Sequence, residues 1–473
     1  MTKNFYKNTS PYIFFSVIII IVFRFILTGA IPLLDKTETR YAEIARIMHE
    51  TNNWIVLQID YGIPFWAKPP LSTWLSAISF ELFGVNEISA RLPSFLLSIT
   101  LLIILGNLVK KSKFSFYLPA FILLTTPEFL IHTGVVSTDT ALCFSIALIM
   151  ISFWKAINEA EQWYWKYLFF IGIALGLLSK GPLVLVLTGP PILFWLIIQK
   201  VKIKELWSRL PWLVGILLTA LLAIPWYILA EIQSPGFIDY FIIGEHFKRF
   251  LISGWEGDLY GSGHSQPKGM IWAFLLLFLF PWIQIVLIKL WKIRKNIFKD
   301  KWVSFLVLWL LWTPIFFTLS KNILHTYILP VTIPMVFLII HWWKDYKHQK
   351  LAVGLASILP IAAIIMLIGL ETNPDLKKQM NTDKYLLTQV SNETLPILFW
   401  KKVSYSSEFY TNGKAQIIAN ELQLDSITKQ ENTFYFLIEN KKKKELPSAY
   451  YEQMKLLDSN KKRSIFLFNN KMK

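Results

Sequence analysis

Cysteine is almost absent from this sequence of 473 residues, with Cys143 as its single example. One thiol cannot form a disulfide framework within the chain or a zinc site built from several cysteines. Charged residues are also scarce at 17%, whereas hydrophobic residues make up 54%. Soluble domains have about 25% charged residues, so this composition disfavours a soluble fold and indicates an integral membrane protein.

Acidic residues are outnumbered by basic ones, 31 against 48, which gives a formal net charge of +17. In a soluble protein such a balance indicates nucleic-acid binding. Here, however, Lys and Arg gather in the loops between apolar runs, for example at residues 200–204 and 292–301. Cytoplasmic loops of membrane proteins carry this excess of positive charge. We therefore expect the lipid bilayer as a partner and no nucleic acid.

Apolar runs recur along the chain, and most are long enough to cross the hydrocarbon core of a bilayer. We expect about eleven transmembrane helices, at residues 12–30, 86–108, 115–131, 138–155, 164–178, 181–199, 209–231, 269–290, 302–319, 324–342 and 351–370. The first run is too long for the core of a signal peptide and has no clear cleavage site after it. It is expected to be an uncleaved anchor.

A cytoplasmic N-terminus places nearly every basic cluster of this threading on the inner side of the membrane. We therefore expect a transmembrane domain over residues 1–370, with an extracytoplasmic first loop at 31–85, and a small soluble α/β domain over 371–473. Short apolar segments with turn residues between them predict the secondary structure of this second domain. Strands are expected at residues 396–400, 416–419, 434–438 and 464–468, and helices at 406–410, 420–427 and 449–457.

The polar residues that interrupt the apolar pattern gather on the outer side of this threading. They come from the first loop and from the turns between later helices: Asp35, Glu38, Arg40, Glu43, Lys68, His132, Asp139, Lys180, Glu245, His246, Arg249, Lys321, His325 and Tyr327. Ionisable residues at the membrane edge are costly and are candidates for a functional site by default. Their convergence predicts a site at the outer surface of the membrane.

Several spaced motifs of the first loop occur in an order that is specific to one family. They are Glu-Thr-Arg-Tyr-Ala-Glu-Ile at residues 38–44, Lys68-Pro69, Trp74, Phe83-Gly84 and Arg91. The chain resembles the integral-membrane glycosyltransferases of the GT-C class that use polyprenyl-phosphate sugars. Among these, it is most similar to the lipid A aminoarabinose transferases and the bacterial protein O-mannosyltransferase-like enzymes. The family usually has Asp-Glu where this chain has Thr37-Glu38, so the first acid lies two residues earlier, at Asp35.

The resemblance implies roles for individual residues. Binding of the donor phosphate is implied for Lys68, for Arg249 in Glu245-His246-Phe247-Lys248-Arg249-Phe250, and for Tyr327 in Tyr-Ile-Leu-Pro, with Lys321 as a further cation. Fixed cations of this kind stabilise the negative charge that develops on a leaving phosphate. The catalytic carboxylate is expected among Asp35, Glu38 and Asp139, as a general base or as a stabiliser of oxocarbenium-like charge. Other candidate site residues are Arg40, Tyr41, Lys180, Glu245, His246 and His325.

Simpler roles remain open for several of these residues. Asp35 and Asp139 can cap helices, Arg249 can pair with Glu245 at i,i+4, and Tyr327 can lie in an aromatic belt. We expect no metal centre and no required cofactor, because His132, His246, His264 and His325 show no metal-ligand spacing. A divalent cation held by carboxylate oxygens is compatible with the sequence.

The resemblance implies that the protein transfers a single sugar from an undecaprenyl-phosphate donor to an extracytoplasmic acceptor. Lipid A, receiving aminoarabinose or a similar amino sugar, is the first expectation for the acceptor, and a protein or another envelope glycan is the second. The expected location is the bacterial inner membrane, with the active site and the C-terminal domain on the periplasmic side. A lipid or sugar transporter is the alternative from another class, but the matched halves of such folds are not seen in the sequence.

Overall fold

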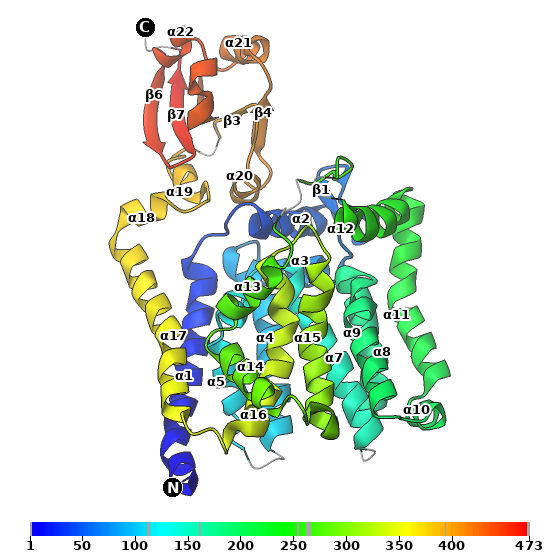
Figure 1. Ribbon diagram of the computed structural model, residues 1–473. Coiled ribbons are helices and arrows are strands. Elements are labelled where there is room, and N and C mark those ends of the chain that lie inside the picture. Colours follow the sequence, from blue (N-terminus) through cyan, green and yellow to red (C-terminus); the bar gives the residue numbers. More distant parts are fainter. Residues whose placement is uncertain are drawn as a thin grey trace.

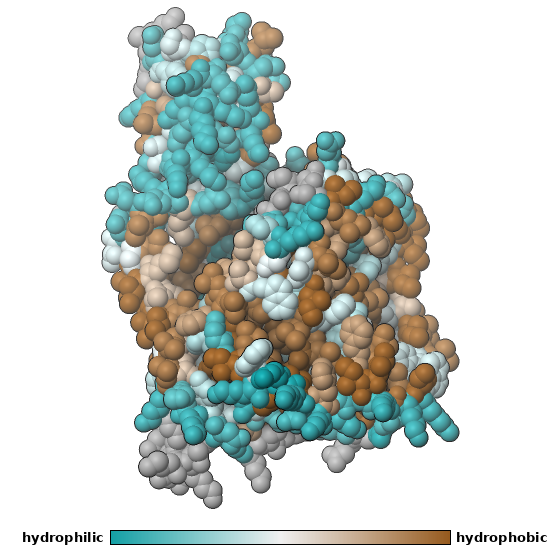
Figure 2. All heavy atoms as spheres, viewed as in Figure 1, coloured by the Kyte–Doolittle hydropathy of each residue, from teal (hydrophilic) through white to brown (hydrophobic). Residues whose placement is uncertain are grey.

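The computed structural model describes residues 2–110, 114–159, 162–252, 255–261, 266–392 and 394–470. A body of long helices carries a small sheet domain at one end, and the N-terminus lies at the opposite end (Figure 1). Helix α17 leads from the body into the sheet domain and runs beside α1, where the Tyr12 and Ser357 hydroxyls lie 2.9 Å apart. Hydrophobic side chains cover the sides of the helical body, and hydrophilic side chains gather at both ends (Figure 2). This distribution is that of an integral membrane protein.

Each predicted apolar run forms a helix or a pair of consecutive helices. The long or apolar helices are α1 (Thr2–Ala30), α4 (Glu87–Lys110), α7 (Thr138–Asn158), α8 (Tyr164–Lys180), α9 (Leu183–Ile198), α11 (Trp212–Gln233), α15 (Lys301–Thr318), α16 (Thr332–Trp343) and α17 (Gln349–Thr372). Among the described residues, seven helical spans are long and apolar enough to cross a membrane, or eight if one bent pair is counted. The sequence predicts eleven transmembrane helices, so the described residues form fewer spans than expected.

The difference arises where an apolar run is shortened or broken. Residues 115–131 form two short helices, α5 (Leu118–Leu124) and α6 (Pro127–His132), because the Thr125 and Thr126 hydroxyls donate back to helical carbonyls and Pro127 has no amide hydrogen. Helices α13 (Met270–Phe278) and α14 (Trp282–Ile293) meet at an angle of 111°. Helices α8 and α9 have only 17 and 16 residues. Hydrophobicity alone does not reveal such breaks.

The remaining helices are short and lie in the loops and in the sheet domain. They are α2 (Thr37–Thr51), α3 (Leu71–Phe83), α10 (Ile203–Arg209), η1 (Asp239–Lys248), α12 (Arg249–Leu251), η2 (Ile297–Lys299), η3 (His325–Val331), α18 (Pro374–Lys378), α19 (Lys384–Leu387), α20 (Tyr405–Tyr410), α21 (Glu421–Gln430), η4 (Asn440–Glu445) and α22 (Ser448–Tyr451). Aromatic side chains fill the core between the long helices, with the buried rings of Phe153, Trp195 and Phe305 in mutual contact.

A buried ion pair fastens the first loop to the helical body. Glu38 in α2 receives Arg91 Nε and Nη2 from α4 at 2.7 Å on its two carboxylate oxygens. Arg91 also donates to the carbonyls of Thr28, Ile31 and Pro32 at the end of α1. Both side chains are almost completely buried. The pair therefore joins the start of α2 to the end of α1 and to the first turns of α4.

The sheet domain has five strands in the order β4-β3-β5-β7-β6. They are β3 (Ile397–Trp400), β4 (Ala415–Ile418), β5 (Thr433–Glu439), β6 (Met454–Ser459) and β7 (Arg463–Asn469), and a two-stranded hairpin in the first loop is formed by β1 (Gln58–Asp60) and β2 (Ile63–Pro64). Strand β3 pairs parallel with β4 and β5, whereas β7 pairs antiparallel with β5 and β6. All four predicted strands are confirmed. The predicted helix at 449–457 is wrong after residue 451, because pairing with β7 draws the following residues into an edge strand.

The sheet domain docks on the first loop through Asp35. Its carboxylate accepts hydrogen bonds from the Ser406 amide at 3.0 Å, the Ser406 hydroxyl at 2.6 Å and the Thr39 hydroxyl at 2.8 Å. Its backbone exchanges two further hydrogen bonds with Asn381. Burial raises the pKa of Asp35 in spite of these hydrogen bonds. Glu408, two residues beyond Ser406, is half-buried near Glu43 and other carboxylates of the first loop.

Replacing Arg91 tests the fastening of the first loop. We expect Arg91→Leu to lower the free energy of unfolding by about 3–5 kcal/mol, because Glu38 is left buried and unpaired. The double variant Arg91→Leu/Glu38→Leu is expected to regain part of this loss. SDS titration of the detergent-purified protein measures both values. Lys377→Leu, which removes a more exposed ion pair with Glu371, is the control and should change the stability little. Equal stability of wild type and Arg91→Leu would contradict the prediction.

The docking of the sheet domain is expected to weaken as the pH rises. Burial and the nearby carboxylates of Glu43, Asp60 and Asp35 raise the pKa of Glu408 from 4.5 to about 8. Between these values the folded protein retains a proton that the unfolded chain releases, so raising the pH favours unfolding. The Tm should therefore fall between about pH 5 and pH 8, and less steeply in Glu408→Gln than in wild type. Glu421→Gln, which changes an exposed carboxylate, is the matched control. Parallel pH profiles of the Tm for wild type and Glu408→Gln would refute the assignment of this pH dependence to Glu408.

Candidate active site

Glu245 lies at the centre of a charged cluster near the end of the body that carries the sheet domain. It comes from η1 and accepts both Lys68 Nζ at 3.0 Å and Arg249 Nη1, which lies 2.8 Å from each carboxylate oxygen. Arg249 Nε lies 3.5 Å from Asp258 Oδ2. Burial raises the pKa of Glu245, but Lys68 and Arg249 outweigh it and hold that pKa below its usual value. Glu245 is therefore an ionised anchor for two cations.

The two cations of this cluster are more accessible than the two carboxylates. The side chains of Lys68 and Arg249 are 19% and 27% exposed, whereas those of Glu245 and Asp258 are 5% and 6% exposed. An anion that approaches the cluster therefore meets the cations first. Two fixed, partly exposed cations are suited to bind a phosphate.

The loop around Lys68 is fixed by hydrogen bonds from neighbouring elements. The Trp66 indole donates to the Ser234 hydroxyl at 2.8 Å, and the Trp66 amide donates to the Tyr260 hydroxyl at 3.0 Å. Lys68 Nζ also donates to the Ala67 carbonyl at 2.5 Å. The ammonium group is thus held in place before any ligand binds, which lowers the entropy cost of binding.

Asp139 and Lys180 form a second, buried pair. Asp139 follows the Ser137 cap of α7 and receives Lys180 Nζ at 2.5 Å and the Ser137 hydroxyl at 2.9 Å. Lys180 ends α8, and its Nζ lies 5.4 Å from the centre of the Tyr327 ring. The Tyr327 ring stacks on Phe317, with 4.5 Å between centroids. Arg249 and Tyr327 are near enough for the charge of one to affect the pKa of the other, so the two clusters are neighbours.

His246 joins η1 to the turn between α8 and α9. Its Nδ1 lies 2.7 Å from the Phe241 carbonyl oxygen, and its Nε2 lies 3.1 Å from the Lys180 carbonyl oxygen. Burial lowers the pKa of His246. Through its two ring contacts, the imidazole holds the segment that carries Glu245 next to Lys180.

Besides His325, five residues predicted for the site lie apart from these two clusters. Asp35 binds the sheet domain, and both oxygens of Glu38 are occupied by Arg91 and by the amides of Leu34 and Val136. Arg40 donates to the Tyr260 carbonyl at 3.0 Å, and Tyr41 packs against Phe65 in the core of the first loop. Lys321 is exposed on the turn before η3. None of these five is in contact with the Glu245 cluster among the interactions of the described residues.

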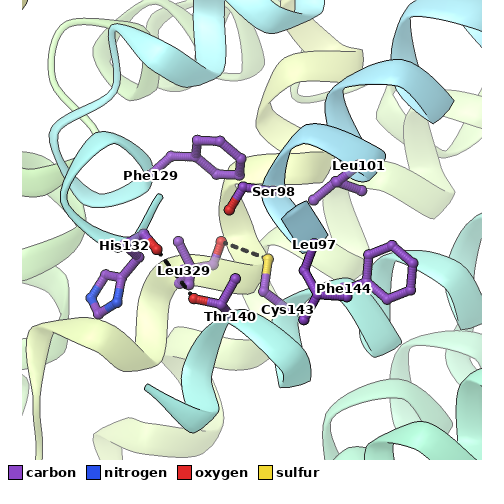
Figure 3. Close-up of a pocket in the computed structure, with 9 residues that line it drawn as sticks. All are labelled: Leu97, Ser98, Leu101, Phe129, His132, Thr140, Cys143, Phe144 and Leu329. Carbon is purple, nitrogen blue, oxygen red and sulfur yellow. Dashed lines mark hydrogen bonds between the residues drawn. The ribbon is translucent and has the colours of Figure 1, made fainter. Parts of the chain in front are cut away.

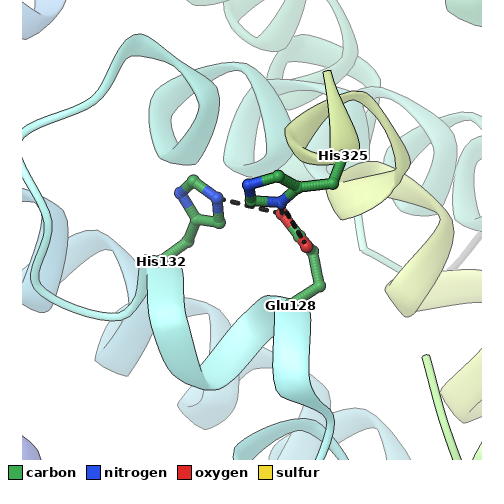
Figure 4. Close-up of side chains that lie close together, drawn as sticks. All are labelled: Glu128, His132 and His325. Carbon is green, nitrogen blue, oxygen red and sulfur yellow. Dashed lines mark hydrogen bonds and ion pairs between the residues drawn. The ribbon is translucent and has the colours of Figure 1, made fainter. Parts of the chain in front are cut away.

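His325 belongs to a group that sequence reasoning missed. It lies against Glu128, which also faces His132 one helical turn later in α6 (Figure 4). The missed member of this group is Glu128. The spacing Glu128-x-x-x-His132 could have revealed it, because residues four apart lie on one face of a helix. Asp258 in the Glu245 cluster was also missed, and it lies in a loop without a recognisable motif.

A small cavity lies beside this group, between α4, α6, α7 and η3 (Figure 3). Its lining is mostly apolar, with His132, Thr140 and Cys143 among the few polar side chains. The Thr140 hydroxyl donates to the His132 carbonyl, and the Cys143 thiol donates to the Leu329 carbonyl. The charged residues of the two clusters do not line this cavity.

The chain is similar to proteins of known family in sequence and fold. The model of the dolichyl-phosphate-mannose-protein mannosyltransferase family matches residues 13–241. An undecaprenyl phosphate-alpha-4-amino-4-deoxy-L-arabinose arabinosyl transferase of Erwinia tasmaniensis is 30% identical over 400 residues, which cover 78% of this chain and 67% of the relative. A second arabinosyl transferase of the same kind, numbered 2, comes from Pseudomonas fluorescens. It is 28% identical over 357 residues, which cover 72% of this chain and 62% of the relative. The chain thus spans 62% to 67% of the length of these two relatives.

The crystal structure of ArnT from Cupriavidus metallidurans bound to undecaprenyl phosphate matches with a TM-score of 0.72 at 16% identity, and covers 98% of this chain and 99% of that one. The archaeal oligosaccharyltransferase AglB from Archaeoglobus fulgidus matches with a TM-score of 0.53 at 14% identity, over 93% of this chain and 70% of that one. At these identities the likeness concerns the fold, and it confirms the predicted helical GT-C architecture with a small C-terminal α/β domain. Together with the sequence matches, it shows that the chain belongs to the family of polyprenyl-phosphate-sugar-dependent integral-membrane glycosyltransferases.

Proposed function

We propose that the protein transfers one sugar from an undecaprenyl-phosphate carrier to lipid A, and that the sugar is aminoarabinose or a similar amino sugar. The observation that carries this proposal is the pair of accessible cations, Lys68 and Arg249, anchored on the buried carboxylate of Glu245. The named substrate of the similar transferases supports both the carrier and the sugar. The match to the mannosyltransferase model makes a protein acceptor the second candidate.

Lys68 and Arg249 bind the phosphate of the donor in this proposal. An acceptor oxygen attacks the anomeric carbon, the new C–O bond forms, and the bond to the carrier phosphate breaks with its electron pair left on the phosphate. The two cations stabilise the negative charge that develops there. Tyr327, whose ring lies beside Lys180, contacts the same phosphate in this proposal.

Asp139 is the catalytic carboxylate in this proposal. It faces the positive charge that develops on the sugar ring as the donor bond breaks, and Lys180 fixes its position. A lipid A phosphate is already anionic, so no strong general base is required for that acceptor. A direct displacement by such an acceptor requires no organic cofactor. Asp35 and Glu38 act at a distance, by docking the sheet domain and by fastening the first loop.

We infer the orientation from the charge distribution of the loops. Basic residues of the loops 200–204 and 292–301 lie at the end of the body opposite to the sheet domain, where hydrophilic side chains gather (Figure 2). The positive-inside rule makes that end cytoplasmic. In the inner membrane of a bacterium, the Glu245 cluster and residues 371–473 then lie on the periplasmic side, where lipid-linked donor and lipid A are both available.

Mass spectrometry of lipid A tests the proposed function. Cells that express the wild-type protein should gain one sugar-sized mass on lipid A, and cells without the gene should lack it. We expect Lys68→Ala and Arg249→Ala to reduce the modified fraction by about 10²- to 10³-fold, because each removes a donor to the leaving phosphate.

Lys455→Ala, which removes an exposed lysine of β6, is the control and should retain the modification. Unmodified lipid A in a strain that expresses the wild-type protein would exclude lipid A as the acceptor. A sugar-sized mass on envelope proteins in that strain would then identify the protein acceptor.

A further inference from the structure

Glu128, His132 and His325 place three potential metal ligands around one point. His132 Nε2 lies 2.9 Å from Glu128 Oε1, and His325 Nδ1 lies 2.9 Å from Glu128 Oε2. The ligand atoms of all three residues lie within 4.8 Å of one another. The side chains converge from α6 and η3, which are far apart in the sequence (Figure 4).

Hydrogen bonds account for only part of this arrangement. His325 Nδ1 lies within hydrogen-bonding distance of both Glu128 carboxylate oxygens. Both ring nitrogens of His132, in contrast, are buried without a well-aligned hydrogen-bond partner in the described part of the chain, although Nε2 lies 2.9 Å from Glu128 Oε1. The His132 side chain is 6% exposed and that of Glu128 is fully buried. A buried polar atom without a partner costs about 1–3 kcal/mol, so a bound cation between these side chains would be favourable.

We propose that Glu128, His132 and His325 bind a Zn²⁺ ion. Two imidazoles and one carboxylate are a donor set that zinc prefers, whereas Mg²⁺ and Ca²⁺ prefer oxygen ligands. Ligands at about 2.0–2.2 Å from a tetrahedral ion lie about 3.3 Å apart, close to the separations between Glu128 and each histidine. Three protein ligands leave the fourth position of a tetrahedral ion open to water or another small ligand.

The proposed ion joins two segments that lead into the active-site clusters. His132 ends α6, and the turn after it leads to Asp139 at the start of α7. His325 begins η3, two residues before Tyr327. Phe278 stacks on the His325 ring, with 4.5 Å between centroids and 10° between planes, and fixes the orientation of that ring. Zinc binding itself does not depend on the proposed function. That the ion holds the segments that carry Asp139 and Tyr327 matters for sugar transfer, and this part rests on the proposed function.

The metal content of the purified full-length chain tests this site. The protein is prepared in detergent with a tag free of histidine, incubated with excess ZnSO₄ and desalted, and zinc is measured by inductively coupled plasma mass spectrometry. We expect about one zinc per chain for wild type and a loss of at least about tenfold in His132→Ala and in His325→Ala, because two ligands hold zinc much more weakly than three. The matched control is His341→Ala, which removes a partly exposed histidine near Asp300 and should retain the metal.

Cobalt provides a second measurement that does not depend on the folding of a variant. Wild-type protein loaded with CoCl₂ should show the visible absorption bands of a four-coordinate site, and added ZnSO₄ should abolish them. Zinc content no higher in wild type than in the His132→Ala/His325→Ala double variant, or the absence of those bands in wild type, would overturn the site. Zinc bound at one per chain with unmodified lipid A would contradict the proposed function instead.

Discussion

The carboxylate of Glu245 is the interaction on which the site depends. Without it, Lys68 and Arg249 would be two neighbouring cations in a partly desolvated region, where like charges repel strongly. With it, both are held within hydrogen-bonding distance of one buried anion, and both stay partly exposed. The carboxylate is enclosed and the cations are accessible, so the cluster is arranged to receive an anionic group. The leaving phosphate of a polyprenyl donor is such a group.

The rest of the structure holds this cluster beside the buried Asp139–Lys180 pair. His246 contacts the carbonyl of Lys180, and the Tyr327 ring lies 5.4 Å from Lys180 Nζ. The Glu38–Arg91 ion pair and the Asp35–Ser406 hydrogen bonds fasten the first loop to the body and to the sheet domain. The first loop in turn carries Lys68. The polar residues of the loops thus divide between the two charged clusters and the contacts that hold these clusters in place, although all lie near one end of the body.

Apolar runs predicted where the helices lie, and the i,i+4 spacing predicted the pair of Glu245 and Arg249. The resemblance named Lys68 as a phosphate-binding residue, which stays a prediction, but the sequence did not predict its contact with Glu245. The sequence could not reveal that Asp35 binds Ser406 or that Glu38 binds Arg91, because these partners are 371 and 53 residues away. A membrane-edge carboxylate has the same local signature whether it binds substrate or an arginine. Strand β6 was missed for a similar reason, since its conformation depends on pairing with β7.

Binding of undecaprenyl phosphate to the purified protein tests the central claim most directly. Thermophoresis in detergent gives the Kd for wild type, for Lys68→Ala/Arg249→Ala and for the Lys455→Ala control. The account predicts that the double variant binds at least about 100-fold more weakly, because hydrogen bonds to a charged group contribute about 1.5–3 kcal/mol each. It also predicts that wild type discriminates against undecaprenol, which has the same chain without the phosphate. Equal affinity of wild type and the double variant for undecaprenyl phosphate would contradict the account.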